Sequence, residues 1–257
     1  MQQILPRVHA LHGQPTGVVA LALLVALTLS AATPAMADTA DGWEGLNRKT
    51  FAFNDWADRR VLRPVAKGYT QIIPKPARIG VHNFFTNLFT PTVVVNQFLQ
   101  GKPLRGTSDL GRFLLNSSVG IGGLFDVATH VGLPEHQEDF GQTLGVWGVP
   151  PGNYTVLPLL GSSNVRDTVS RAVDSMTNPL RFLRPVEHRY SLLALSVIDL
   201  RAELLKVDQL VVGDEYVFLR EAYSQRREFL INDGEFSEDG FDDDFGDEFG
   251  AEFDGEP

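Results

Sequence analysis

Residues 78–100 read RIGVHNFFTNLFTPTVVVNQFLQ, and this stretch is the best single guide to the fold. Its apolar side chains recur at spacings of three and four residues, which is the period of a helix with one apolar face. Pro91 interrupts the run, and a proline inside a helix removes one hydrogen bond and clashes with the preceding turn. The sequence therefore predicts two helices that meet at a kink, with a broad face rich in phenylalanine.

Helical periodicity continues on both sides of this stretch. Residues 45–56 align their apolar side chains on one face, and prolines near residues 64 and 74 are expected to separate short segments. Residues 131–161 are dense in glycine and proline and show no helical period, so they are predicted to form a long loop whose only strand-like run is 154–157. Further helices are expected after the caps Ser108–Asp109 and Ser162 or Ser163, over 192–212, and from Asp214 to Ile231. The predicted fold class is all-α.

The N-terminal residues 1–37 have the pattern of a secretory signal peptide. Arg7 supplies positive charge, and a nearly unbroken apolar run extends over residues 18–32. This run is about 15 residues long, short of the roughly 20 that span a bilayer. Ala35-Met36-Ala37 fits the small-x-small pattern before a cleavage site, so we expect Ala37 to be the last residue removed and Asp38 to begin the mature chain.

The net charge of −10 comes almost entirely from the C-terminal end. Eleven of the 32 acidic residues lie within 235–257, so the rest of the chain is about neutral and has no basic surface for nucleic acid. Like charges and glycines favour a disordered tail. Five regularly spaced phenylalanines leave open that the tail docks on a partner. The expected organisation is thus a signal peptide, one helical domain over 38–234, and an acidic tail over 235–257.

Catalytic motifs are scarce in the sequence. It contains no cysteine, no GxSxG nucleophile elbow and no phosphate-binding P-loop, so no catalytic residue, cofactor or metal site is predicted. His136, close to Glu138 and Asp139, is the best candidate for acid–base chemistry or metal binding. What remains is a set of amphipathic helices, whose apolar faces either form one core or lie flat in a membrane interface.

Several ordered motifs resemble the MlaA/VacJ family. They are GWEGLNR at 42–48, LQGKP at 99–103, RFLLN at 112–116, GIGG at 120–123 and FGQTLG at 140–145. The resemblance extends over about residues 41–230, and that many motifs in order make a chance match implausible. The signal peptide and the acidic tail lie outside it.

This resemblance implies a fold and a function. Members of the family form a helical ring in the inner leaflet of the outer membrane, associate with trimeric porins, and pass misplaced outer-leaflet phospholipid through an amphipathic channel to the periplasmic carrier MlaC. The expected protein is therefore a passive lipid transporter at the periplasmic face of the outer membrane, and not an enzyme. Typical members carry an acylated cysteine that this sequence lacks, so membrane attachment is expected to rest on amphipathic helices and on partners.

The resemblance also assigns roles to residues of this sequence. A membrane-level helix would include Asn83, Phe84, Phe85, Leu88 and Phe89. The lipid channel or its gating loop would include Gly120, Gly122, Gly123, Phe125, Asp126, Phe140, Gly145, Trp147 and Tyr154. Two other functions stay open: a periplasmic lipid hydrolase that uses His136 with Glu138 or Asp139, and a structural adaptor that binds porins without moving lipid.

Overall fold

The computed structural model describes residues 42–206, 208 and 213–234. The predicted signal peptide with its cleavage site at Ala37 and Asp38, and the acidic tail over 235–257, lie outside the described residues. Within them the elements follow in this order: α2 (Glu44–Ala57), the π-helical turn η1 (Asp58–Leu62), α3 (Arg63–Ile72), α4 (Lys75–Leu99), α5 (Pro103–Ser118), α6 (Val127–His130), α7 (Phe140–Val146), β1 (Tyr154–Leu157), β2 (Gly161–Asn164), α8 (Val165–Thr177), the 3-10 turn η2 (Pro179–Phe182), α9 (Val186–Leu204) and α10 (Glu215–Ile231).

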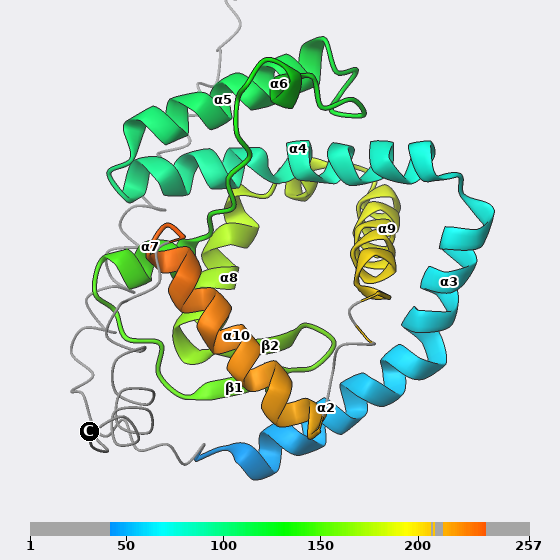
Figure 1. Cartoon of the computed structure of the whole chain (residues 1–257), viewed down its shortest axis with the longest axis vertical. Helices are drawn as coiled ribbons and strands as arrows, with labels where there is room; N and C mark the ends of the chain where they lie inside the picture. The colour runs from blue at the N-terminus through cyan, green and yellow to red at the C-terminus, as the bar shows by residue number, and fades with distance from the viewer. Residues whose placement is uncertain (1–41, 207, 209–212, 235–257) are drawn as a thin grey trace, which may run out of the picture. The chain divides into compact units, whose positions relative to one another are not determined.

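The helices of this part of the chain follow one another around a ring (Figure 1). The predicted all-α, ring-like fold class is confirmed. The segment α2–η1–α3 forms one side, and α4 crosses the next with α5 folded back against it. The remaining side consists of α7, α8, α10 and the antiparallel pair β1–β2. Helix α9 packs against both α3 and α4 on the inner side of the ring.

The prediction of two separate helices meeting at Pro91 is wrong, because α4 is a single helix from Lys75 to Leu99 with Pro91 in its interior. A helix-interior proline costs about 3 kcal/mol. Helix α4 packs against α5, α7, α8 and α9 along its length, and this packing outweighs the local cost. The break predicted near Pro64 is also absent. In the π-helical turn η1 the N–H of Arg63 is bonded to the oxygen of Asp58, five residues earlier, and the helix continues into α3 past the proline.

Two predicted helix caps are displaced. Helix α5 begins at Pro103 rather than after Ser108–Asp109, because proline is favoured at the first position of a helix. Helix α8 is capped by Asn164, whose side chain accepts a hydrogen bond from Asp167 N, rather than by Ser162 or Ser163. The cap at Asp214 is confirmed, since its side chain accepts from the amide nitrogens of Tyr216 and Val217.

The loop predicted over 131–161 contains more regular structure than expected. The strand-like run Tyr154–Leu157 is indeed a strand, and it pairs with Gly161–Asn164. The short helix α7 was not predicted. Its start is fixed by Asp139, whose carboxylate accepts from Gln142 N at 2.8 Å.

Candidate functional site

Apolar and polar side chains are distributed in an unusual way over the described residues. More polar or charged side chains are buried than hydrophobic ones, and the exposed large hydrophobic side chains outnumber the buried hydrophobic ones by more than two to one. Leu104, Ile72 and Phe182 are 86%, 78% and 76% exposed. Extended exposed apolar surface on this scale marks contact with a membrane or a partner. None of the helices described here is long and apolar enough to cross a bilayer.

An apolar groove of about 820 Å³ lies between the first turns of α4 and residues 124–130, and we call it the α4 groove. Helix α4 contributes Ala77, Ile79 and Gly80 to one wall. Phe125 and Val127 contribute to the other wall. The small residues on α4 leave room that longer side chains would fill, so the groove can accept an apolar chain.

Three residues predicted from the family resemblance line this groove together. Asn83, expected on the membrane-level helix, faces Phe125 and Asp126, expected at the channel. The structure therefore brings into one place residues that lie more than 40 positions apart, and Asn83 Nδ2 donates to the oxygen of Leu124 at 3.4 Å.

The predicted glycines shape the wall of the groove instead of lining it. A Cβ atom at Gly120 would lie 2.3 Å from the carbonyl oxygen of Phe125. A Cβ atom at Gly123, where φ is +93°, would lie 2.6 Å from Cβ of Asn87. Both positions need glycine so that the loop can close against α4 and α5. Gly122 has a φ of +68°, and a Cβ atom there would meet no neighbour within 4 Å.

Asp126 is held by a cluster of polar contacts. Arg112, which is almost fully buried, donates to both of its carboxylate oxygens at 3.1 and 3.2 Å, and Asn116 Nδ2 donates at 3.0 Å. Burial acts to raise the pKa of Asp126, but hydrogen bonds from Thr129 and Asn116 and the charge of Arg112 lower it to about 2. The carboxylate is therefore charged at neutral pH and fixes the loop to α5.

The four apolar residues expected at membrane level differ in their exposure. Phe85 is only 5% exposed and contacts Phe84 edge-on and Phe89 in a stacked arrangement. Phe84, Leu88 and Phe89 are half-buried. Phe85 therefore packs inside the helix assembly, whereas Phe84, Leu88 and Phe89 keep part of their surface exposed.

The remaining predicted channel residues do not line the α4 groove. Phe140 is buried and contacts Trp147 edge-on, at the two ends of α7. A Cβ atom at Gly145 would lie 2.7 Å from the side chain of Ile231, so this glycine allows α7 to approach α10. Tyr154 belongs to a cluster of aromatic rings with tyrosines of α10.

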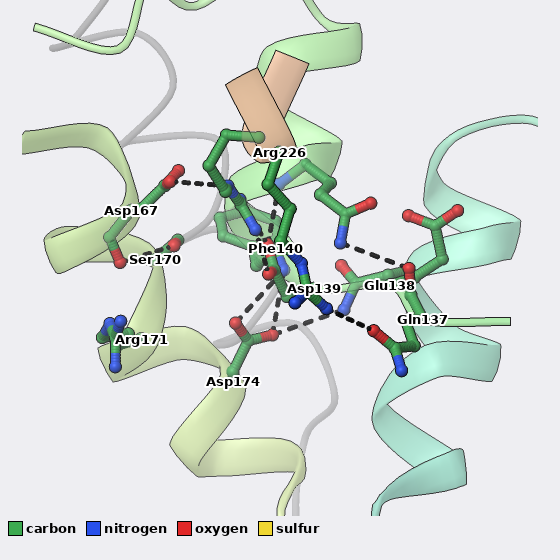
Figure 2. Close-up of polar contacts among 12 residues, drawn as sticks. Gln137, Glu138, Asp139, Phe140, Asp167, Ser170, Arg171, Asp174 and Arg226 are labelled. Atoms are coloured by element: carbon green, nitrogen blue, oxygen red, sulfur yellow. Dashed lines mark hydrogen bonds and ion pairs between the residues drawn. The ribbon is translucent and has the colours of Figure 1, made fainter. Parts of the chain in front are cut away.

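Helices α7, α8 and α10 meet around charged side chains, of which Asp167 is buried and Asp139, Asp174 and Arg227 are half-buried (Figure 2). Arg227 of α10 donates to the two oxygens of Asp139 at 2.6 and 2.9 Å, and its Nε lies 2.8 Å from Asp167 of α8. The amide of Phe140 donates to Asp174 at 3.0 Å. Burial and the nearby charge of Asp139 raise the pKa of Asp174 to about 7. This network fixes the start of α7 between two helices.

The geometry separates the residues of the proposed hydrolase. His136 Nδ1 lies 2.9 Å from the buried carboxylate of Asp109. Glu138 accepts from Gln100 Nε2 at 2.7 Å, while Asp139 binds Arg227. The three side chains thus face three different partners, and among the described residues no group of three histidines or carboxylates is placed to bind a metal ion.

Comparison with known proteins identifies the family. Residues 39–230 match the family model described as MlaA lipoprotein. This chain belongs to the MlaA lipoprotein family.

Named relatives support the assignment to the MlaA family. The intermembrane phospholipid transport system lipoprotein MlaA of Escherichia coli (strain K12) is 40% identical over 203 residues, which cover 76% of this chain and 80% of that protein. The protein of the same name from Haemophilus influenzae is 32% identical over 235 residues, covering 87% and 94%. A solved structure described as the structural basis for maintenance of bacterial outer membrane lipid asymmetry matches with a TM-score of 0.68 at 39% identity, covering 75% of this chain and 100% of that chain.

The charged cluster of α8 and α10 was not among the residues predicted for this MlaA family member. A signal for them exists in the sequence, since Asp167, Ser170 and Asp174 recur at spacings of three and four and place a polar stripe on one face of α8. The sequence alone does not say that this polar stripe points inward. Its partner Arg227 lies 53 residues beyond Asp174, on a helix whose position the local pattern does not give.

Proposed function

We propose that this chain transports phospholipid at the outer membrane and so maintains the lipid asymmetry of that membrane. It lies in the inner leaflet with its exposed apolar side chains among acyl chains, and lipid that has strayed into the outer leaflet passes along the ring towards the periplasm. The observation that carries this proposal is the inverted distribution of side chains, with polar residues inside and large hydrophobic residues outside.

The α4 groove is the proposed path of the lipid tails. It is apolar, about 820 Å³ in volume, and open at the surface beside the helix that we propose lies at membrane level. The polar side chains Asn83 and Asp126 at its edge give the groove an amphipathic character that suits a molecule with one polar end.

The partners and the direction of transport are part of the proposal. A trimeric porin would hold the ring in place, and an MlaC-like periplasmic carrier would receive the lipid. The sequence has no nucleotide-binding motif, so we propose that the chain is a passive conduit and that the carrier and its downstream machinery drive net flow.

A groove-filling substitution tests the function directly. In a deletion strain, we expect phospholipid to accumulate in the outer leaflet, and the wild-type chain to reverse this. Gly80→Trp fills the α4 groove, because a Cβ atom at Gly80 would lie at an ordinary 3.5 Å from Leu124 and helix geometry is kept. This variant should reach normal levels in the membrane but fail to restore asymmetry.

The matched control is Gly68→Trp on α3, where a Cβ atom meets no neighbour within 4 Å and which does not line the groove. It should restore asymmetry fully. Normal outer-leaflet composition in the deletion strain would refute the proposed function. Full rescue by Gly80→Trp would instead favour the porin-adaptor function, because an adaptor does not need an open groove.

A further inference from the structure

We propose that a second cavity, between α3, α4 and α9, binds the phosphate group of a phospholipid, and we call it the headgroup cavity. This inference rests on the proposed function and names the part of the lipid that this corner of the ring recognises. The cavity has a volume of about 400 Å³, within the usual range of ligand sites.

Three cationic side chains line the headgroup cavity without a carboxylate partner among the described residues. They are Lys75 and Arg78 of α4 and Lys206, which follows α9. Arg78 Nε is shielded from solvent and has no hydrogen-bond partner. Because Arg78 has no carboxylate partner among the described residues, binding of an anion to its guanidinium group would be favoured. The guanidinium group matches the geometry of phosphate oxygens.

Two carboxylates, Asp199 and Glu203, also line the cavity, but they contact Tyr69 and His82 and form no ion pair with the three cations. Buried Asp199 accepts from the hydroxyl of Tyr69 at 2.9 Å, and His82 Nδ1 lies 3.4 Å from Asp199 and 3.3 Å from Glu203. Burial and the hydrogen bond to Asp199 raise the pKa of Tyr69, so its hydroxyl keeps its proton and remains a donor to Asp199. Three cations against two carboxylates leave one net positive charge in the cavity, and Lys75 and Arg78 place two of the cations on the wall formed by α4.

The headgroup cavity and the α4 groove are adjacent. Ile79 lines both of them, so the first turns of α4 separate a cationic site from an apolar one. A molecule that carries a phosphate next to two long apolar chains can use both sites at once. A free phosphate ion can use only the headgroup cavity, and this difference lets the two sources of phosphate be distinguished.

The experiment compares two probes against the purified full-length chain in dodecyl maltoside. The first is dihexanoyl phosphatidylethanolamine below its critical micelle concentration, and the second is inorganic phosphate at the same ionic strength. Isothermal titration calorimetry should show saturable binding of the lipid and at least tenfold weaker binding of inorganic phosphate. Arg78→Gln and Lys75→Gln should each weaken lipid binding by about tenfold, since each removes a charged hydrogen bond.

Two substitutions serve as matched controls, because Lys67 and Arg60 are exposed, form no ion pair within the described part of the chain and lie outside the cavity. Lys67→Gln and Arg60→Gln should bind the lipid as the wild type does. Lys75 is exposed, so Lys75→Gln keeps the test valid if Arg78→Gln does not fold. Unchanged lipid binding in the cavity variants would overturn the proposal, as would inorganic phosphate binding as tightly as the lipid.

The same variants separate this inference from the proposed function. If the deletion strain shows disturbed asymmetry and Lys75→Gln restores it as well as Lys67→Gln does, transport does not use the headgroup cavity and the inference is lost while the function stands. If the strain shows no disturbance but the purified chain binds lipid through Arg78, the function is lost while the binding site stands.

Discussion

Replacing Asp174 by asparagine tests whether the interior of the ring is built from charged groups. Burial and the neighbouring carboxylate of Asp139 raise the pKa of Asp174 from 3.8 to about 7, whereas the unfolded chain keeps the ordinary value. Between pH 4 and 7 the folded state therefore holds a proton that the unfolded state releases. The free energy of unfolding consequently falls as pH rises through this window and is constant above it.

The expected magnitude follows from the shift. About three pKa units correspond to about 4 kcal/mol at pH 8. Asp174→Asn removes the charge but keeps an oxygen that can accept from Phe140 N at 3.0 Å and from Asn96 Nδ2 at 3.3 Å. We expect the variant to be more stable than the wild type at pH 8 by up to about 4 kcal/mol. For a domain of this size that raises Tm by roughly 10 °C, and the difference should vanish near pH 4.

The assay is thermal unfolding of the purified chain in dodecyl maltoside, followed by circular dichroism from pH 4 to pH 8. The difference between variant and wild type removes the contribution of the histidines, which both proteins share. Asp139 does not interfere, because its pKa is lowered by Arg227 and its contribution is lost only as pH falls below 3.8. Glu187→Gln, at an exposed carboxylate of α9, is the control and should leave Tm unchanged.

Equal Tm values for Asp174→Asn and the wild type at pH 8 would refute the reasoning. So would a difference that stays constant from pH 4 to pH 8, because only a titrating group produces a change within that window.

Three further predictions concern the groove and the outer surface. Asp126→Asn should lower the free energy of unfolding at pH 7 by about 1 kcal/mol, because it weakens the partner of buried Arg112 at a site that solvent partly screens; denaturant titration measures this. Gly123→Ala should lower Tm clearly, since the new Cβ atom would lie 2.6 Å from Asn87 at a φ of +93°, and an unchanged Tm would contradict this geometry. Trp56 is 56% exposed, so brominated phospholipid vesicles should quench its fluorescence in a variant whose other tryptophans are phenylalanine.

The sequence predicted the helices well because their period is local. Helix α10 and its cap at Asp214 follow from side chains within one or two turns of one another. The continuity of α4 through Pro91 was missed because tertiary packing overrides local preference there. The start of α5 was missed although it follows from a local preference, that of Pro103 for the first position of a helix. Helix α4 owes its continuity to neighbours that come from distant parts of the chain.

The candidate site was predictable only in part for the same reason. Asn83, Phe125 and Asp126 were singled out through the family resemblance, and the structure brings them into one groove. Periodicity shows that a helix has two faces but not which face meets solvent, protein or lipid. The headgroup cavity could not be predicted, because Arg78 and Lys206 are brought together by the packing of α9 on α3 and α4.

The inverted distribution of side chains also explains why ion pairs hold the ring together. In the proposed membrane location, apolar helix faces would gain little free energy by exchanging contact with lipid hydrocarbon for contact with one another, so polar contacts would decide which helices meet. Arg201 of α9 binds both oxygens of Asp58 in η1 at 2.7 and 2.8 Å and reaches Asp208 at 2.9 Å. Arg63 of α3 binds the same oxygen of Asp208 at 2.7 Å. These contacts fix α9 against the α2–η1–α3 side without disulfides, and because α9 forms one wall of the headgroup cavity, the ion pairs that stabilise the ring also set the width of the proposed lipid site.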